Sequence, residues 1–158
     1  MAYIKTASVS RDIAADPMTV WSAVADITRM GEWSPEVESC TWQEGHGEPV
    51  VGARFDGHNR NDDNGKEWDT HAEISAAEPG VSFHFKALFG DRDYHFANWH
   101  YDFEAIEGGT RVTESWEDLR PDEIIAGSSG MSGVEDRATH NTAGMEETLR
   151  RIAAAVES

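Results

Sequence analysis

Between Val37 and Leu119 the chain is a succession of short alternating segments separated by turn residues, and this pattern constrains the fold most strongly. Turns form readily where Gly and Asn tolerate positive φ angles, and such residues recur at 45–47, 62–65, 78–80, 90–91 and 108–109. Strands are predicted between these turns, near 37–44, 51–60, 66–77, 81–89, 93–106 and 110–119. Since sequential strands joined by short turns pair antiparallel, we expect a meander rather than βαβ units.

The residues before this region predict one more strand and two short helices. Alternation over 3–13 indicates the strand. Asp16 is a favourable N-cap and Pro17 a favourable first helical residue, so a helix is expected to begin there. A second helix is expected after Thr28 and must end by Ser34, because Pro35 disfavours helical geometry in the residue before it.

The chain closes with a long amphipathic helix. Ser132 and Glu135 match the S-x-x-E capping box, which predicts that the helix begins here. Apolar side chains then recur at helical spacing, at Val134, Ala138, Met145, Leu149, Ile152 and Val156. A helix of about 24 residues is not stable alone in water and needs a sheet to lie on. We therefore predict an α+β helix-grip fold, in which a curved seven-stranded antiparallel sheet grips the C-terminal helix within one domain over 1–158.

Composition argues against several classes of function. Thirteen Lys and Arg against 30 Asp and Glu give a net charge of −17, which repels nucleic acid and anionic lipid headgroups. This charge fits an acidic solvent-exposed surface, with adaptation to salt as the alternative. Cys40 is the only cysteine, so no internal disulfide can form. We find no signal-peptide pattern and no apolar segment of the ~20 residues that span a bilayer. We therefore expect a cytoplasmic monomer or homodimer without membrane insertion.

Several short motifs occur in an order that resembles the SRPBCC, or START-like, superfamily, in particular its small actinobacterial polyketide cyclase/dehydrase members. The run from Ala15 to Trp21, followed by Asp26 and Trp33-Ser-Pro35, resembles the opening of these proteins, and later landmarks are similar at 51–55, 109–113 and 144–149. The resemblance implies a cavity between sheet and helix that binds lipids, sterols, plant hormones or polyketides. It does not imply one reaction, because members include aromatase/cyclases, lipid carriers, hormone receptors and oxygenase subunits. The oxygenase alternative is disfavoured, since the sequence shows no 2-His-1-carboxylate spacing and no second domain.

Strand alternation selects the side chains expected to face the helix. Core packing alone would explain each aromatic ring, and their number on one concave face adds weight to an apolar pocket for a small molecule. The predicted ligand-binding set comprises Trp68, Phe83, Phe85, Trp99, Tyr101, Phe103, Glu114 and Trp116 of the strands, with Arg137 and Met145 of the terminal helix.

Glu114 is the residue best suited to chemistry. It shares a strand face with Val112 and Trp116, and burial between apolar neighbours raises a carboxyl pKa and suits the group to acid/base work or to holding a ligand hydroxyl. Alternatively, Arg137 or His140 pairs with Glu114 for structural reasons. A one-residue shift of register would instead turn Thr113, Ser115 and Glu117 inward.

The seven histidines show no metal-ligand spacing. His95 and His100 fall on opposite faces of one strand, and His58, His71 and His84 belong to separate strands. No metal and no cofactor is therefore expected, with a cross-strand histidine cluster as the alternative. The Gly/Ser-rich segment 127–133 is expected to be a flexible connector or a flap for ligand access.

Three functions stay open from the sequence. The first is a binding or carrier protein without chemistry. The second is a polyketide cyclase/aromatase or dehydratase, for which Glu114, Tyr101 and His140 are tentative catalytic residues. The third is an interaction protein whose exposed face matters more than its cavity.

Overall fold

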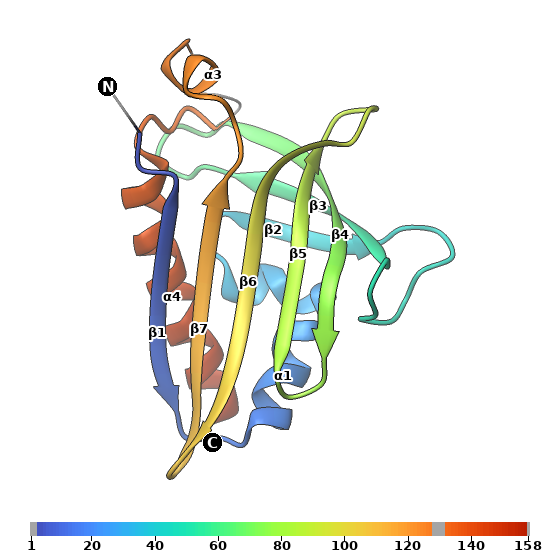
Figure 1. Ribbon diagram of the computed structural model, residues 1–158, viewed down its shortest axis with the longest axis vertical. Helices are drawn as coiled ribbons and strands as arrows, with labels where there is room; N and C mark the ends of the chain where they lie inside the picture. Colours follow the sequence, from blue (N-terminus) through green and yellow to red (C-terminus); the bar gives the residue numbers. More distant parts are fainter. Residues whose placement is uncertain (1–2, 128–131, 158) are drawn as a thin grey trace.

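In a computed structural model, which describes residues 3–127 and 132–157, one curved antiparallel sheet wraps around the C-terminal helix (Figure 1). The strands are β1 (Thr6–Ile13), β2 (Val37–Trp42), β3 (Arg54–Arg60), β4 (Glu67–Glu78), β5 (Ser82–Phe89), β6 (Tyr94–Ile106) and β7 (Gly109–Asp118). Their order in the sheet is β1-β7-β6-β5-β4-β3-β2. The meander runs from β2 to β7, and β1 adds to its end by pairing with β7. The predicted α+β helix-grip fold is confirmed.

The observed strands match the predicted ones to within three residues at each end. The largest difference inside the meander is at β3, which begins at Arg54 rather than at residue 51. Val51 and Gly52 form a turn instead, and Gly52 takes a φ of +90° that favours glycine.

The helices between β1 and β2 follow the predicted order. They are α1 (Pro17–Ala25), the 3₁₀ turn η1 (Ile27–Arg29) and α2 (Met30–Trp33). Asp16 is the N-cap residue of α1, although its carboxylate accepts from the Thr19 hydroxyl rather than from a backbone N–H. Ser34 follows α2 in extended conformation, as expected immediately before Pro35.

The C-terminal helix α4 (Arg137–Val156) has 20 residues and begins later than predicted. Its N-cap is Asp136, whose carboxylate accepts from the Thr139 backbone N–H at 3.1 Å and from the Thr139 hydroxyl at 2.8 Å. The predicted capping box of Ser132 and Glu135 is therefore wrong. Ser132 lies in a turn before the helix, where its hydroxyl accepts from the Val134 N–H at 3.3 Å.

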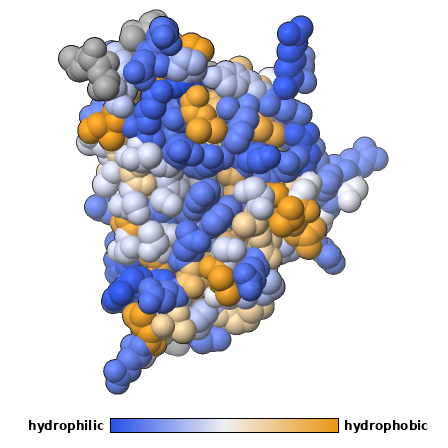
Figure 2. All heavy atoms as spheres, in the orientation of Figure 1, coloured by the Kyte–Doolittle hydropathy of each residue, from blue (hydrophilic) through white to orange (hydrophobic). Residues whose placement is uncertain are grey.

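The terminal helix crosses the inner side of the sheet, packing closely on β1 and lying behind β1 and β7 in Figure 1. The outer side of the sheet is covered mostly by hydrophilic and intermediate side chains, with hydrophobic residues only in small separate groups (Figure 2). A short helix, α3 (Asp122–Gly127), follows β7 at one end of the sheet. Within the described residues, no helix has the length and apolar character needed to cross a membrane.

The core contains two clusters of buried apolar side chains, and α4 contributes to both. The larger cluster includes α1, η1, α2 and the inner faces of several strands, and Leu149, Ile152 and Ala153 join it from the last turns of α4. The smaller cluster, around Trp116, receives Ala138 and Met145 from the first half of α4. Between the sheet and that first half, the packing is incomplete.

Candidate functional site

A cavity of about 340 Å³ lies between the inner face of the sheet and the first half of α4. Small-molecule sites in proteins typically occupy ~300–1,000 Å³ and are lined mainly by apolar side chains. The strands line this cavity with aromatic rings, among them Phe55, Trp68, Phe85, Phe96, Trp99 and Trp116. The helix lines it with Arg137, His140, Asn141, Gly144, Met145 and Thr148.

The structure brings most of the predicted site residues together around this cavity. Those that line it are Trp68, Phe85, Trp99, Tyr101, Glu114, Trp116, Arg137, His140 and Met145. Phe83 and Phe103 face the same side of the sheet but lie outside the cavity, buried in the larger core cluster with Val20 and Val24 of α1. Alternation predicts the face of a strand but not the position along it where another helix covers that face.

Glu114 lies on the inner face of β7, as the alternation predicts. Its side chain is 3% exposed, and the strand register places it between Val9 of β1 and Tyr101 of β6. The alternative register is excluded, because Thr113 points to the outer face and its hydroxyl bonds that of Ser10 at 2.7 Å. Oε1 of Glu114 has no hydrogen-bond partner within residues 3–127 and 132–157.

The environment of Glu114 favours its neutral form. Burial raises the pKa of this carboxyl from 4.5 to about 8, although the neighbouring hydroxyl of Tyr101 opposes the rise. Burial, followed by the nearby charge of Glu114, also raises the pKa of Tyr101 well above its ordinary value. At neutral pH the cavity wall therefore carries an uncharged carboxylic acid beside an uncharged phenol, and each can donate a proton in a hydrogen bond.

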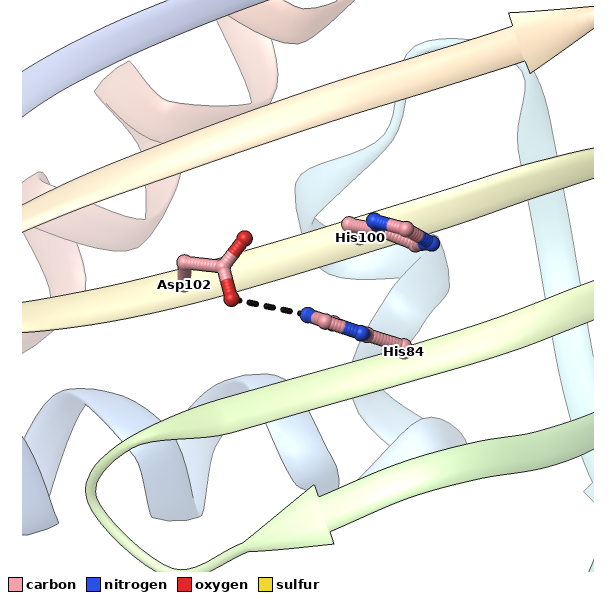
Figure 3. A group of neighbouring side chains, drawn as sticks. All are labelled: His84, His100 and Asp102. Carbon is pink, nitrogen blue, oxygen red and sulfur yellow. Dashed lines mark hydrogen bonds and ion pairs between the residues drawn. The ribbon is translucent and has the colours of Figure 1, made fainter.

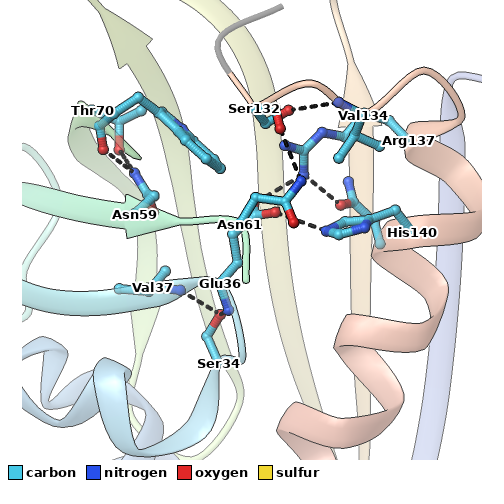
Figure 4. Close-up of polar contacts among 12 residues, drawn as sticks. Ser34, Glu36, Val37, Asn59, Asn61, Thr70, Ser132, Val134, Arg137 and His140 are labelled. Atoms are coloured by element: carbon cyan, nitrogen blue, oxygen red, sulfur yellow. Dashed lines mark hydrogen bonds and ion pairs between the residues drawn. The ribbon is translucent and has the colours of Figure 1, made fainter. Parts of the chain in front are cut away.

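Arg137 and His140 pair with Glu36, which lies between α2 and β2, and not with Glu114 (Figure 4). Nη1 of Arg137 lies 2.9 and 3.0 Å from the two carboxylate oxygens of Glu36, and Nε2 of His140 lies 2.8 Å from Oε2. The predicted pairing of either residue with Glu114 is therefore wrong. The three side chains join the first turns of α4 to the start of β2 at the edge of the cavity.

Glu36 is held in its charged form. Burial alone would raise the pKa of Glu36, but the hydrogen bond with His140 and the charge of Arg137 outweigh burial and lower it. Because His140 and Arg137 both bond Glu36, their role at the cavity edge is structural.

Asn141 is a cavity residue that the sequence reasoning missed. Its side chain is 5% exposed, and its Oδ1 accepts from Nη1 of Arg137 at 3.1 Å. Its Nδ2 donates to no group in the part of the chain that the structure describes. A signal was present, because positions 138, 141, 145 and 152 share one helical face and Asn141 is the polar member of an apolar stripe.

Within the described residues, two groups of three histidine and acidic side chains lie outside the cavity. His84, His100 and Asp102 gather across β5 and β6 (Figure 3), and Glu38, His58 and Glu67 gather across β2, β3 and β4. Strand register rather than linear spacing brings these side chains together, as in a cross-strand cluster. The expectation that no metal binds stays a prediction.

The curved sheet, the gripped helix and the cavity between them define the helix-grip class of proteins. Within it, the family described as polyketide cyclase/dehydrase and lipid transport matches residues 5–157. The chain belongs to this family, and the resemblance that its motifs indicated is confirmed.

Solved structures agree with this assignment. The polyketide-cyclase-like protein Cgl2372 from Corynebacterium glutamicum is 36% identical, with 96% of this chain and 91% of that chain covered and a TM-score of 0.63. CV1439 from Chromobacterium violaceum is 19% identical over 98% of this chain and 99% of that chain, with a TM-score of 0.72. The di-domain ARO/CYC protein StfQ of the steffimycin biosynthetic pathway is 15% identical over 96% of this chain and 50% of its own, with a TM-score of 0.72. The last two show the shared fold. No curated protein matches the sequence.

Proposed function

We propose that this chain is a binding or carrier protein for a small, largely apolar molecule that places a hydroxyl or carbonyl group against Glu114. The observation that carries this proposal is the unpartnered carboxyl oxygen of Glu114 in the wall of an aromatic-lined cavity. A buried polar atom without a hydrogen bond costs about 1–3 kcal/mol. A ligand group that bonds this atom would recover that free energy, while the aromatic rings would cover the rest of the ligand.

The open end of the cavity supports access for such a ligand. Phe89, Tyr94 and Ile124 line the cavity and are also among the exposed large hydrophobic residues. An apolar rim of this kind offers contacts to an apolar ligand at the entrance, before the ligand is buried in the cavity. The predicted flap at 127–133 stays a prediction, because residues 128–131 lie outside the described part of the chain.

A thermal-shift screen against fatty acids, sterols, flavonoids and aromatic polyketides tests the binding function. A ligand at a hundredfold its Kd stabilises a protein by about 2.7 kcal/mol, or roughly 5–10 °C for a domain of this size. We expect a shift for one chemical class, and a smaller shift in Glu114→Gln than in the outer-face control Glu117→Gln. Flat responses from the folded protein with every class would contradict the proposal.

A second candidate function is that of a polyketide cyclase/aromatase or dehydratase. It is favoured by the raised pKa of Glu114, since a general acid works best with a pKa near the working pH. The ARO/CYC proteins among the structural neighbours share this fold at low identity. Here Glu114 and Tyr101 would supply the proton, while His140 would hold Glu36. Turnover of a poly-β-ketone substrate that Glu114→Gln abolishes, with binding retained, would establish the enzyme; turnover unchanged in that variant would exclude this role.

The domain extent, cellular location, oligomeric state and partners are proposed from the sequence. We propose one domain over 1–158 that acts in the cytoplasm, as a monomer or homodimer, without a nucleic-acid partner. The net charge of −17 supports the last point.

A further inference from the structure

The outer face of the sheet carries a cluster of His84, His100 and Asp102, on the side away from the cavity (Figure 3). The two imidazole rings are stacked, with centroids 3.9 Å apart and planes 11° from parallel. Nε2 of His84 lies 2.8 Å from Oδ1 of Asp102. One potential ligand atom from each residue lies within 4.8 Å of the other two.

Strand pairing holds the three side chains in place. His84 of β5 is directly opposite His100 of β6 in the register, and directly opposite residues in antiparallel strands have Cβ atoms about 4.5–5.5 Å apart on one face. Asp102 follows His100 by two positions, so it shares that face. The backbone of the two central strands therefore fixes this group, and small side-chain rotations suffice to adjust it.

Two imidazole nitrogens and a carboxylate oxygen are a donor set for divalent transition metals. A tetrahedral Zn²⁺ ion with ligands at ~2.0–2.2 Å separates neighbouring ligand atoms by roughly 3.3–3.6 Å. The separation between His84 and Asp102, 2.8 Å, is shorter than this, and all separations within the group are below 4.8 Å. Rotation about the side-chain bonds can bring the three atoms to the required spacing and leaves the remaining coordination positions to water.

Charge also favours a cation here. The protein carries a net charge of −17, which raises the local concentration of cations.

The second histidine cluster differs in the availability of its ring nitrogens. Both ring nitrogens of His58 are engaged, with Asp69 Oδ1 at 2.6 Å and Glu67 Oε1 at 2.9 Å. These hydrogen bonds, of which the one with Asp69 has the larger effect, raise the pKa of His58 to about 9. His58 is therefore an imidazolium at neutral pH without a free lone pair, and it provides a matched control.

We propose that His84, His100 and Asp102 form a binding site for one divalent transition-metal ion of the Zn²⁺, Ni²⁺ or Cu²⁺ class on the outer face of the sheet. A bound ion joins β5 to β6 directly behind Phe85, Trp99 and Tyr101, which are cavity residues of the same two strands. The proposal does not depend on what the cavity binds.

Calorimetric titration of the untagged, chelator-treated full chain with Zn²⁺ and with Ni²⁺ tests this site. We expect one equivalent to bind with a micromolar Kd, and His84→Gln, His100→Gln and Asp102→Asn each to weaken binding at least tenfold. His58→Gln should bind as the unsubstituted protein does. Unchanged affinity in the His84 and His100 variants would overturn the proposal, as would the absence of saturable binding below millimolar metal.

A second measurement covers the case in which a variant is unstable. In ¹⁵N-labelled unsubstituted protein, one equivalent of Zn²⁺ should shift the amide signals of residues 84, 100 and 102 and leave those around residue 58 in place. The melting temperature should rise by roughly 5–10 °C at a hundredfold excess over Kd. Signal changes centred on residue 58, or spread over the acidic surface without a focus, would overturn the site.

Discussion

The two halves of α4 lie on the same sheet, yet one half closes the core and the other leaves a cavity. Leu149 and Ile152 in the last turns are fully buried in the larger core cluster. The first turns instead present Arg137, Asn141 and Gly144 to the cavity. Polar and small side chains fill the space less completely than Leu and Ile do, and Glu36 anchors Arg137 and His140 at the cavity edge. The comparison indicates that stability resides mainly in the closed half and binding in the open half.

The largest expected effect is the loss of packing in the closed half. Leu149→Ala should lower the free energy of unfolding by about 2–5 kcal/mol, the range for a fully buried leucine. Met145→Ala in the open half should cost less, about 2 kcal/mol at the lower end of that range, because Met145 borders a space that already exists. Urea denaturation of both variants measures the difference, and an equal or larger cost for Met145→Ala would remove the distinction between the two halves.

The next effect concerns how stability depends on pH in the open half. The pKa of Glu114 is about 8 in the folded protein and 4.5 ordinarily, so between these values the folded state holds a proton that the unfolded state releases. The contribution of Glu114 is therefore fully present below about pH 4.5 and is lost as pH rises to 8, by an amount on the order of a few kcal/mol. In Glu114→Gln, denaturation at pH 5, 6.5 and 8 should show a free energy of unfolding that falls less steeply with rising pH than in the unsubstituted protein. An equally steep fall in both would mean that Glu114 is already ionised in the folded state.

A smaller effect, opposite in its pH dependence, is expected at the cavity edge. Glu36→Gln should destabilise the protein by about 1–3 kcal/mol at pH 7, because Arg137 and His140 lose their charged partner in a half-buried position. The pKa of Glu36 is lowered below 4.5, so its contribution is present above 4.5 and is lost as pH falls below that value. The unsubstituted protein and the variant should converge in stability as the pH falls; a constant difference would show that charge plays no part.

The meander from β2 to β7 was predictable because short turns make consecutive strands neighbours, and the inward position of Glu114 was predictable because side chains alternate with a period of two. The pairing of β1 with β7 was not predicted. The partner of Arg137 was not predictable, since Glu36 lies 101 residues away in a connection without periodicity. The predicted start of α4 was also wrong, because Ser132 and Asp136 are both acceptable N-cap residues and only the tertiary structure decides between them. Asn61 and Asn64 hold Ser132 in the turn before the helix, because their side-chain amides donate to its backbone carbonyl at 2.8 and 2.9 Å.

The histidine clusters on the sheet were likewise not predictable from spacing along the chain. His84 and His100 are 16 positions apart in the chain, and only their exact opposition in the register makes them neighbours. A shift of one residue would have put them on opposite faces. Asn141 differs from these cases, because its place in the apolar stripe of α4 was visible in the sequence.

The cavity contains a neutral carboxylic acid whose unpartnered oxygen is available to a ligand group. The most direct test is a ¹³C NMR pH titration of the Glu114 side-chain carboxyl in the ligand-free protein, assigned with the Glu114→Gln variant. We predict a titration midpoint near pH 8 and a change in the carboxyl signal when a ligand from the screen is added. A midpoint at or below 4.5 would show a charged carboxylate with satisfied hydrogen bonds and would contradict the proposed role of Glu114.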